Sequence, residues 1–143
     1  LGGLVGSEMC IRDSVNDSKG TNVGATMAAL EGLGGDRDVL LIAGGQGKGA
    51  DFSQLQGAVA RHCKLVVLIG EDAPQLQLAL DQHAELASAA TMDEAVALAA
   101  ARAVPGDCVL LSPACASFDM FTGFADRGDA FARAVQRVRE GRS

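Results

Sequence analysis

The sequence predicts a three-layer α/β domain in which a mostly parallel sheet lies between two layers of helices. Three short apolar runs, Val39–Ala43, Leu65–Ile69 and Cys108–Leu111, are continuous rather than alternating. Such runs are typical of strands that are covered on both faces. Helical patterns lie between the runs, and glycines beside them favour tight turns from strand to helix. Strands that alternate with helices predict a doubly wound sheet.

The first half of the chain contains two predicted helices, one on each side of the first apolar run. Residues Asn22 to Leu33 have a helical pattern that ends at Gly34 and Gly35. Phe52 to Cys63 has a second helical pattern, and it leads directly into the second apolar run.

The second half contains three further predicted helices. Pro74–His83 has its proline near the helix start, where the missing N–H does no harm. Met92–Val104 follows Thr91, and Glu94 stands at the third helical position, so that the two residues form a capping box. A Pro-Gly-Asp turn then leads into the third apolar run. The last predicted helix, Asp129–Glu140, has apolar residues on one face.

The first fourteen residues, LGGLVGSEMCIRDS, do not fit this alternation. They contain no strand of convincing length and no clear amphipathic period. We therefore expect a loose arm, for which non-native sequence is one explanation.

Composition limits the classes of function. A chain of 143 residues with 48% hydrophobic residues suits one compact domain. The net charge of -6, without a basic cluster, argues against a nucleic-acid surface, and no apolar run approaches the ~20 residues of a membrane span. The cysteines, Cys10, Cys63, Cys108 and Cys115, form no CxxC and have no histidine at metal spacing, so we expect reduced thiols in a cytosolic protein.

Two glycine-containing corners are candidates for anion binding. The first, NDSKGTN at Asn16–Asn22, opens a predicted helix, where free N–H groups attract anions. Lys19 adds a positive charge there, and Thr21 either caps the helix or binds a ligand. The second, AGGQGKGADF, follows a strand and carries Lys48, but it does not match the Walker A motif GxxxxGK[ST]. Taken alone, the first corner favours an ordinary capped helix with solvated charges, and the second is equally compatible with an ordinary turn.

A third corner, LLSPACASFDMFTGFADRGDAF, ends the last predicted strand. Ser112 and Ser117 flank Cys115, but the two histidines, His62 and His83, both fall in predicted helices. Because a serine or cysteine nucleophile needs a histidine within reach, this pattern argues against a hydrolase. A packed structural cysteine is the simpler interpretation.

The three corners together predict more than each does alone. Turns that follow parallel strands share one edge of the sheet, so we expect Lys19, Thr21, Lys48 and Ser117 to converge on one cleft. Two ammonium groups and several hydroxyls would suit a small dianion such as a dicarboxylate.

In this order and spacing, NDSKGTN, GGQGKGADF and LLSPACASFDMFTGFADRGDAF resemble the C-terminal domain of the Mur ligase family. The resemblance covers about Val15 to Arg139 and favours the D-glutamate-adding branch over the diaminopimelate- or lysine-adding branches. It implies a Rossmann-like, dinucleotide-binding-like topology. It also implies ATP-dependent amide formation, in which the carboxylate of UDP-N-acetylmuramoyl-L-alanine is phosphorylated and then attacked by the amine of D-glutamate.

The resemblance also implies roles for single residues. Thr21 and Lys48 match residues that bind one carboxylate of the amino acid. Ser117 and the backbone at Phe124 match those at its other carboxylate. It leaves open which carboxylate each pair holds.

For the nucleotide, Asp17 matches an acid at the ribose of ATP and Lys19 matches a lysine near the phosphates. The family's phosphate loop, Mg²⁺ ligands and modified lysine belong to its central domain and have no counterpart in this sequence. A His-Arg pair in the family's upstream linker is also missing. Residues 1–14 stand in place of that linker and resemble nothing in the family, so the first strand of the domain is expected to be missing as well.

We therefore expect an unmatched arm over residues 1–14 and a Mur ligase C-terminal domain over 15–143. The expected protein is a cytoplasmic monomer that binds neither nucleic acid nor membrane, and a ligase fragment that is inactive alone. Two alternatives stay open, namely a free-standing module that binds a small dicarboxylate or nucleotide, and a structural remnant without a working site.

Overall fold

A computed structural model describes residues 11–16, 22–33, 37–45, 51–70, 72–104, 107–112 and 123–139. Within these ranges the chain forms a five-stranded sheet in the order β1-β5-β2-β3-β4, and every neighbouring pair is parallel. The strands are β1 (Ile11–Asn16), β2 (Val39–Gly44), β3 (Cys63–Ile69), β4 (Glu85–Ser88) and β5 (Asp107–Leu111). The predicted α/β fold with a parallel sheet is confirmed.

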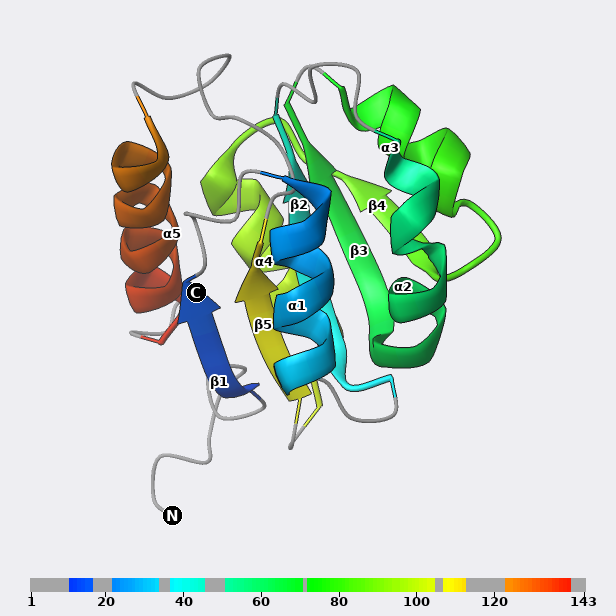
Figure 1. Cartoon of the computed structure of the whole chain (residues 1–143). Coiled ribbons are helices and arrows are strands. Elements are labelled where there is room, and N and C mark those ends of the chain that lie inside the picture. The colour runs from blue at the N-terminus through cyan, green and yellow to red at the C-terminus, as the bar shows by residue number, and fades with distance from the viewer. Residues whose placement is uncertain are drawn as a thin grey trace.

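Helices cover both faces of the sheet and complete the three layers (Figure 1). One face packs against α1 (Val23–Leu33), the 3-10 helix η3 (Phe52–Leu55), α2 (Gln56–His62) and α3 (Ala73–Leu80). The other face packs against α4 (Met92–Arg102) and α5 (Phe124–Arg139).

The central strand β2 explains why the apolar runs are continuous. All six of its residues are buried. Leu40 and Ile42 pack into the core beneath α4 and α5, whereas Val39, Leu41 and Ala43 pack into the core on the opposite face. A strand between two helical layers has no solvent-facing side, and its sequence therefore shows no polar alternation.

The strand order places a topological switch point between β2 and β5. The chain proceeds from β2 to β3 and β4 on one side, and then crosses back to β5 on the other side of β2. In open parallel sheets, ligands bind beyond the carboxyl ends of the strands at such a point. The fold therefore predicts a ligand site beyond the carboxyl ends of β2 and β5.

The prediction of no strand in the first fourteen residues is wrong, and so is the expectation that the first strand is lost. Residues from Ile11 to Asn16 form β1, which pairs in parallel with β5 from Asp107 to Leu111. This strand lies at the edge of the sheet, where polar residues are tolerated because pairing uses only the backbone. Its sequence, IRDSVN, consequently lacks the apolar run on which strand prediction depended.

Two chains that differ by four residues test this correction. A chain that starts at Val15 loses three of the five registered pairs between β1 and β5, whereas a chain that starts at Ile11 keeps them all. We expect the shorter chain to melt at least about 4 °C lower, which corresponds to about 1 kcal/mol in a domain of this size. Equal melting temperatures by circular dichroism would mean that β1 contributes nothing to stability.

Helix boundaries differ from the predictions at helix starts and at helix ends. The predicted helix over Phe52–Cys63 is divided into η3 and α2, and Asp51 accepts the N–H of Ser53 at 3.1 Å as the cap of η3. Hydrogen bonds from the Ser53 side chain and backbone lower the pKa of the Asp51 carboxyl. Helix α5 begins at Phe124 instead of Asp129.

The capping box of α4 is confirmed. The N–H of Glu94 donates to the Thr91 hydroxyl at 3.1 Å, and the Glu94 carboxylate accepts the N–H of Ala90 at 2.7 Å. Helix α4 ends at Arg102 and α3 ends at Leu80, each earlier than predicted.

Two cysteines of the described residues, Cys63 and Cys108, are buried free thiols. Burial raises the pKa of Cys63 from 9.0 to about 12. Since the thiolate is the reactive form, we expect Cys63 to react with iodoacetamide at pH 8 about a thousandfold more slowly in the folded chain than in urea. Site-resolved mass spectrometry measures this labelling, and fast labelling of Cys63 in the folded chain would contradict the prediction.

The raised pKa of Cys63 also means that this thiol ionises at lower pH in the unfolded chain than in the folded chain. It should therefore reduce the stability of the fold as the pH rises from 9 towards 12.

Candidate functional site

The candidate site lies at the carboxyl edge of the sheet, which we define by the ends of β1, β5 and β2. These strands are neighbours, and they end at Asn16, Leu111 and Gly44. Asn16 is in register with Leu111, and Leu111 with Ile42. The three predicted corners therefore leave the sheet from three adjacent strands, as the argument for convergence requires.

Most of the predicted site residues fall outside the part of the chain that the structure describes. These are Asp17, Lys19, Thr21, Lys48 and Ser117. The sixth, Phe124, is the first residue of α5. The N–H of Arg127 donates to the carbonyl of Gly123 at 3.1 Å, so the intrahelical bonds of α5 begin there. The first amides of a helix have no intrahelical acceptor, which suits the predicted backbone role at Phe124.

Asn22 caps α1, directly after the first corner. Its side-chain oxygen accepts the N–H of Ala25 at 2.8 Å, and its carbonyl accepts the N–H of Thr26 at 3.3 Å. Of the two roles considered for Thr21, the capping role is thus taken by its neighbour. Asparagine is among the best capping residues, so the sequence did contain the signal.

A buried pair of hydroxyl groups joins α1 to the end of β5. The Thr26 hydroxyl donates to the carbonyl of Ser112 at 3.0 Å, and the Ser112 hydroxyl donates to the Thr26 oxygen at 3.1 Å. Both residues have a relative exposure of 0%. The N–H of Ser112 also donates to the carbonyl of Ile42 at 3.3 Å. Ser112, which follows β5 at the third corner, therefore contacts α1 after the first corner and β2 before the second.

Two glycines near the start of the second corner have positive φ angles. Gly44 has φ 136° and Gly45 has φ 133°. A Cβ on Gly44 would lie 1.8 Å from the carbonyl oxygen of Ile69, so β2 passes β3 there more closely than any side chain permits. The carbonyl of Gly45 accepts the N–H of Asp72 at 2.9 Å, which ties the start of the corner to the start of α3.

The opposite, amino edge of the sheet carries an ion pair. The Lys64 ammonium donates to Asp107 Oδ2 at 2.7 Å, and the same oxygen accepts the N–H of Val104 at 2.8 Å. Asp107 is buried, and the bonds of its carboxylate to Lys64 and Val104 fix the start of β5. None of the described residues at this edge is a predicted site residue.

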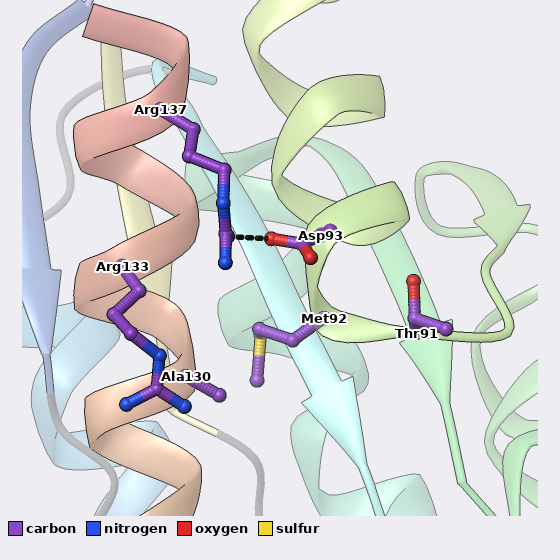
Figure 2. Close-up of a pocket in the computed structure, with 6 residues that line it drawn as sticks. All are labelled: Thr91, Met92, Asp93, Ala130, Arg133 and Arg137. Carbon is purple, nitrogen blue, oxygen red and sulfur yellow. Dashed lines mark hydrogen bonds and ion pairs between the residues drawn. The ribbon is translucent and has the colours of Figure 1, made fainter.

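A cavity of about 180 Å³ lies between α4 and α5 (Figure 2). It is lined by Thr91, Met92, Asp93, Ala130, Arg133 and Arg137. Arg137 reaches across to Asp93 in an ion pair whose side chains are both more than half exposed. Exposed pairs of this kind contribute about 0–1 kcal/mol. Of the described residues that line the cavity, none is a predicted site residue.

None of the helices in the described ranges is long and apolar enough to cross a membrane. In the same ranges, no three side chains from His, Cys, Asp and Glu come together in a group that could hold a metal ion.

Comparison with known families defines the class of the chain. The model of the family described as "Mur ligase, glutamate ligase domain" matches residues 7–115, and the chain belongs to this family. The match includes β1, β2, β3, β4 and β5, and it also includes part of the segment that was expected to resemble nothing in the family.

Individual relatives carry one enzyme name, UDP-N-acetylmuramoylalanine-D-glutamate ligase. The protein of Pseudomonas fluorescens is 56% identical over 85% of this chain and 28% of its own length. That of Albidiferax ferrireducens is 59% identical over 84% of this chain and 24% of its own length. That of Coxiella burnetii is 56% identical over 88% of this chain and 29% of its own length. The chain thus spans about a quarter of the length of these relatives.

Proposed function

We propose that this chain is the D-glutamate-binding domain of an ATP-dependent ligase that joins D-glutamate to UDP-N-acetylmuramoyl-L-alanine in peptidoglycan synthesis. The observation that carries the proposal is the departure of three corners from adjacent strand ends, combined with relatives whose names specify this ligase. The fold alone would leave the function open, because many activities share parallel α/β sheets.

The proposed site assigns D-glutamate to residues of all three corners. Thr21 and Lys48 hold one carboxylate of the amino acid, and Ser117 with the backbone N–H at Phe124 holds the other. Lys48 supplies the positive charge, while the hydroxyls and the amide fix the direction of each carboxylate. Two fixed carboxylates leave the amine in one orientation, which lowers the entropic cost of its attack on the activated substrate.

We propose that ATP binds at the corner that follows β1. Asp17 would accept the ribose hydroxyls and Lys19 would lie near the phosphates, directly after the end of the strand. When bound, ATP supplies the phosphoryl group that activates the carboxylate of the muramoyl substrate. In our proposal, Mg²⁺ and the muramoyl nucleotide are held by parts of the ligase outside this sequence, and the enzyme acts in the cytoplasm as a monomer.

A hybrid ligase tests whether this chain binds D-glutamate for the ligation. In this hybrid, the segment of the Pseudomonas fluorescens relative that matches this chain is replaced by this chain. We expect the hybrid to release phosphate from ATP only when both the muramoyl nucleotide and D-glutamate are present, and to form the amide. L-Glutamate serves as the control substrate and should give no product.

The isolated chain should be inactive in the same assay, because the groups that hold Mg²⁺ and the terminal phosphate of ATP are contributed by the remainder of the ligase. Ligation by the chain alone would contradict this division of roles. A folded hybrid without D-glutamate-dependent turnover would contradict the proposed function and favour a free-standing binding module.

A further inference from the structure

We infer that Thr26 and Ser112 are positioning residues, whose paired hydroxyls hold the first and third corners in register across the carboxyl edge. The inference rests on the proposed function. Thr26 follows Thr21 by five residues, and Ser112 precedes Ser117 by five residues. The link therefore joins the two segments that carry both proposed hydroxyl contacts to D-glutamate.

The geometry makes this link directional. Two hydrogen bonds, at 3.0 and 3.1 Å, join the side chain of Thr26 to both the hydroxyl and the carbonyl of Ser112. Apolar packing would tolerate sliding of α1 along β5, whereas two hydrogen bonds to neighbouring atoms fix the position of the helix along the strand. Through its N–H bond to Ile42, Ser112 extends the same register to β2 and thus to the corner that carries Lys48.

Burial makes the link hard to replace. Both side chains are fully buried, and water does not substitute readily for a lost partner at such a place. Removing the Thr26 hydroxyl would take away the donor that binds the Ser112 carbonyl and the acceptor that binds the Ser112 hydroxyl, so α1 would no longer be held at this position. Shifts of about 1 Å at a substrate-positioning group reduce turnover by as much as about a hundredfold.

The test measures Thr26→Val and Thr26→Ser in the hybrid ligase. Valine keeps the shape of threonine but removes the hydroxyl, and serine keeps the hydroxyl but removes the methyl group. We expect the KM for D-glutamate to rise about tenfold in Thr26→Val, because a displaced corner would lose about one hydrogen bond to D-glutamate. The serine variant should have the KM for D-glutamate of the unmodified hybrid, and the KM for the muramoyl nucleotide should stay unchanged in both variants.

Lys64→Met provides a matched control. It breaks another polar link to β5, in which Asp107 is buried and Lys64 is half-buried, but at the amino edge. We expect it to lower the melting temperature without raising the KM for D-glutamate. Ser112→Ala probes the same hydroxyl pair from β5, and combining it with Thr26→Val should add little to the KM of the single variant, because the two residues act as one unit.

The outcomes separate the two proposals. If the unmodified hybrid is active but Thr26→Val and Ser112→Ala lower only the melting temperature, as Lys64→Met does, the inference is overturned. Should Thr26→Val fail to fold, the KM of Ser112→Ala for D-glutamate decides alone. An unmodified hybrid that lacks D-glutamate-dependent turnover contradicts the proposed function itself.

Discussion

Replacing Gly44 by alanine is expected to destabilise the domain by about 4 kcal/mol or more, a large part of the stability of a typical domain. The added Cβ would lie 1.8 Å from the carbonyl oxygen of Ile69, and a backbone atom cannot rotate away as a side chain would. The φ angle of 136° is also one that residues with a Cβ rarely adopt. The clash requires β2 to separate from β3 at the carboxyl edge, and the φ angle adds backbone strain at Gly44 itself.

Gly57→Ala is the matched control for this change. Gly57 lies in α2, and a Cβ there meets nothing within 4 Å. Alanine is the better helix former by about 1 kcal/mol, so this variant should melt at or slightly above the unmodified chain. The measurement is thermal unfolding followed by circular dichroism. If Gly44→Ala melts within about 2 °C of the unmodified chain, the close approach of β2 to β3 is wrong, since 1 kcal/mol alone moves the transition by more.

Lys48→Ala in the hybrid ligase is expected to raise the KM for D-glutamate by about tenfold to a hundredfold. A hydrogen bond to a charged group contributes about 1.5–3 kcal/mol, which corresponds to this range of affinity. Because the proposed role of Lys48 is to bind a ligand, stability should change by no more than about 0.5 kcal/mol. The KM values for ATP and the muramoyl nucleotide should change much less.

Arg133→Ala controls for the loss of one positive charge. Arg133 is an exposed residue of α5, and it lies outside the carboxyl edge as defined by the strand ends. Its removal changes the net charge of the chain as Lys48→Ala does but should leave the kinetics of D-glutamate unaltered. Unchanged D-glutamate kinetics in Lys48→Ala would remove this residue from the proposed site, and stability loss alone would assign it a structural role.

The sequence predicted the buried part of the fold better than its edges. Continuous apolar runs identified β2, β3 and β5, because strands between two helical layers contain little else. The two edge strands, β1 and β4, were missed. β4 is half-exposed, with the sequence ELAS, and neither edge strand has an apolar run. Pairing at an edge depends on backbone groups, which no side-chain pattern reports.

Caps were predictable where side chains make them, and approaches between backbones were not. Thr91 and Glu94 gave a capping box in the sequence that the structure confirms. By contrast, the contact between Gly44 and Ile69 joins residues far apart in the chain, and no local pattern indicates it.

The candidate site divides in the same way. The convergence of the three corners followed from the rule for parallel sheets, and the ends of β1, β5 and β2 agree with it. The roles of Asp17, Lys19, Thr21, Lys48 and Ser117 stay predictions, because these residues lie outside the described ranges. The link between Thr26 and Ser112 was not foreseen, since it joins residues 86 positions apart in the sequence.

The most direct measurement is the titration of the ¹⁵N-labelled chain with D-glutamate, followed by the amide chemical shifts. The account predicts saturable shifts at the carboxyl edge, at Gly44, Gly45 and Ser112 and at the start of α5. The amides of Lys64 and Asp107 at the amino edge should stay unmoved, and L-glutamate should produce weaker shifts. Millimolar affinity is sufficient for this experiment, because the shifts report binding that amounts to only about 4 kcal/mol. Shifts confined to the amino edge, or equal responses to both enantiomers, would contradict a D-glutamate site at the carboxyl edge.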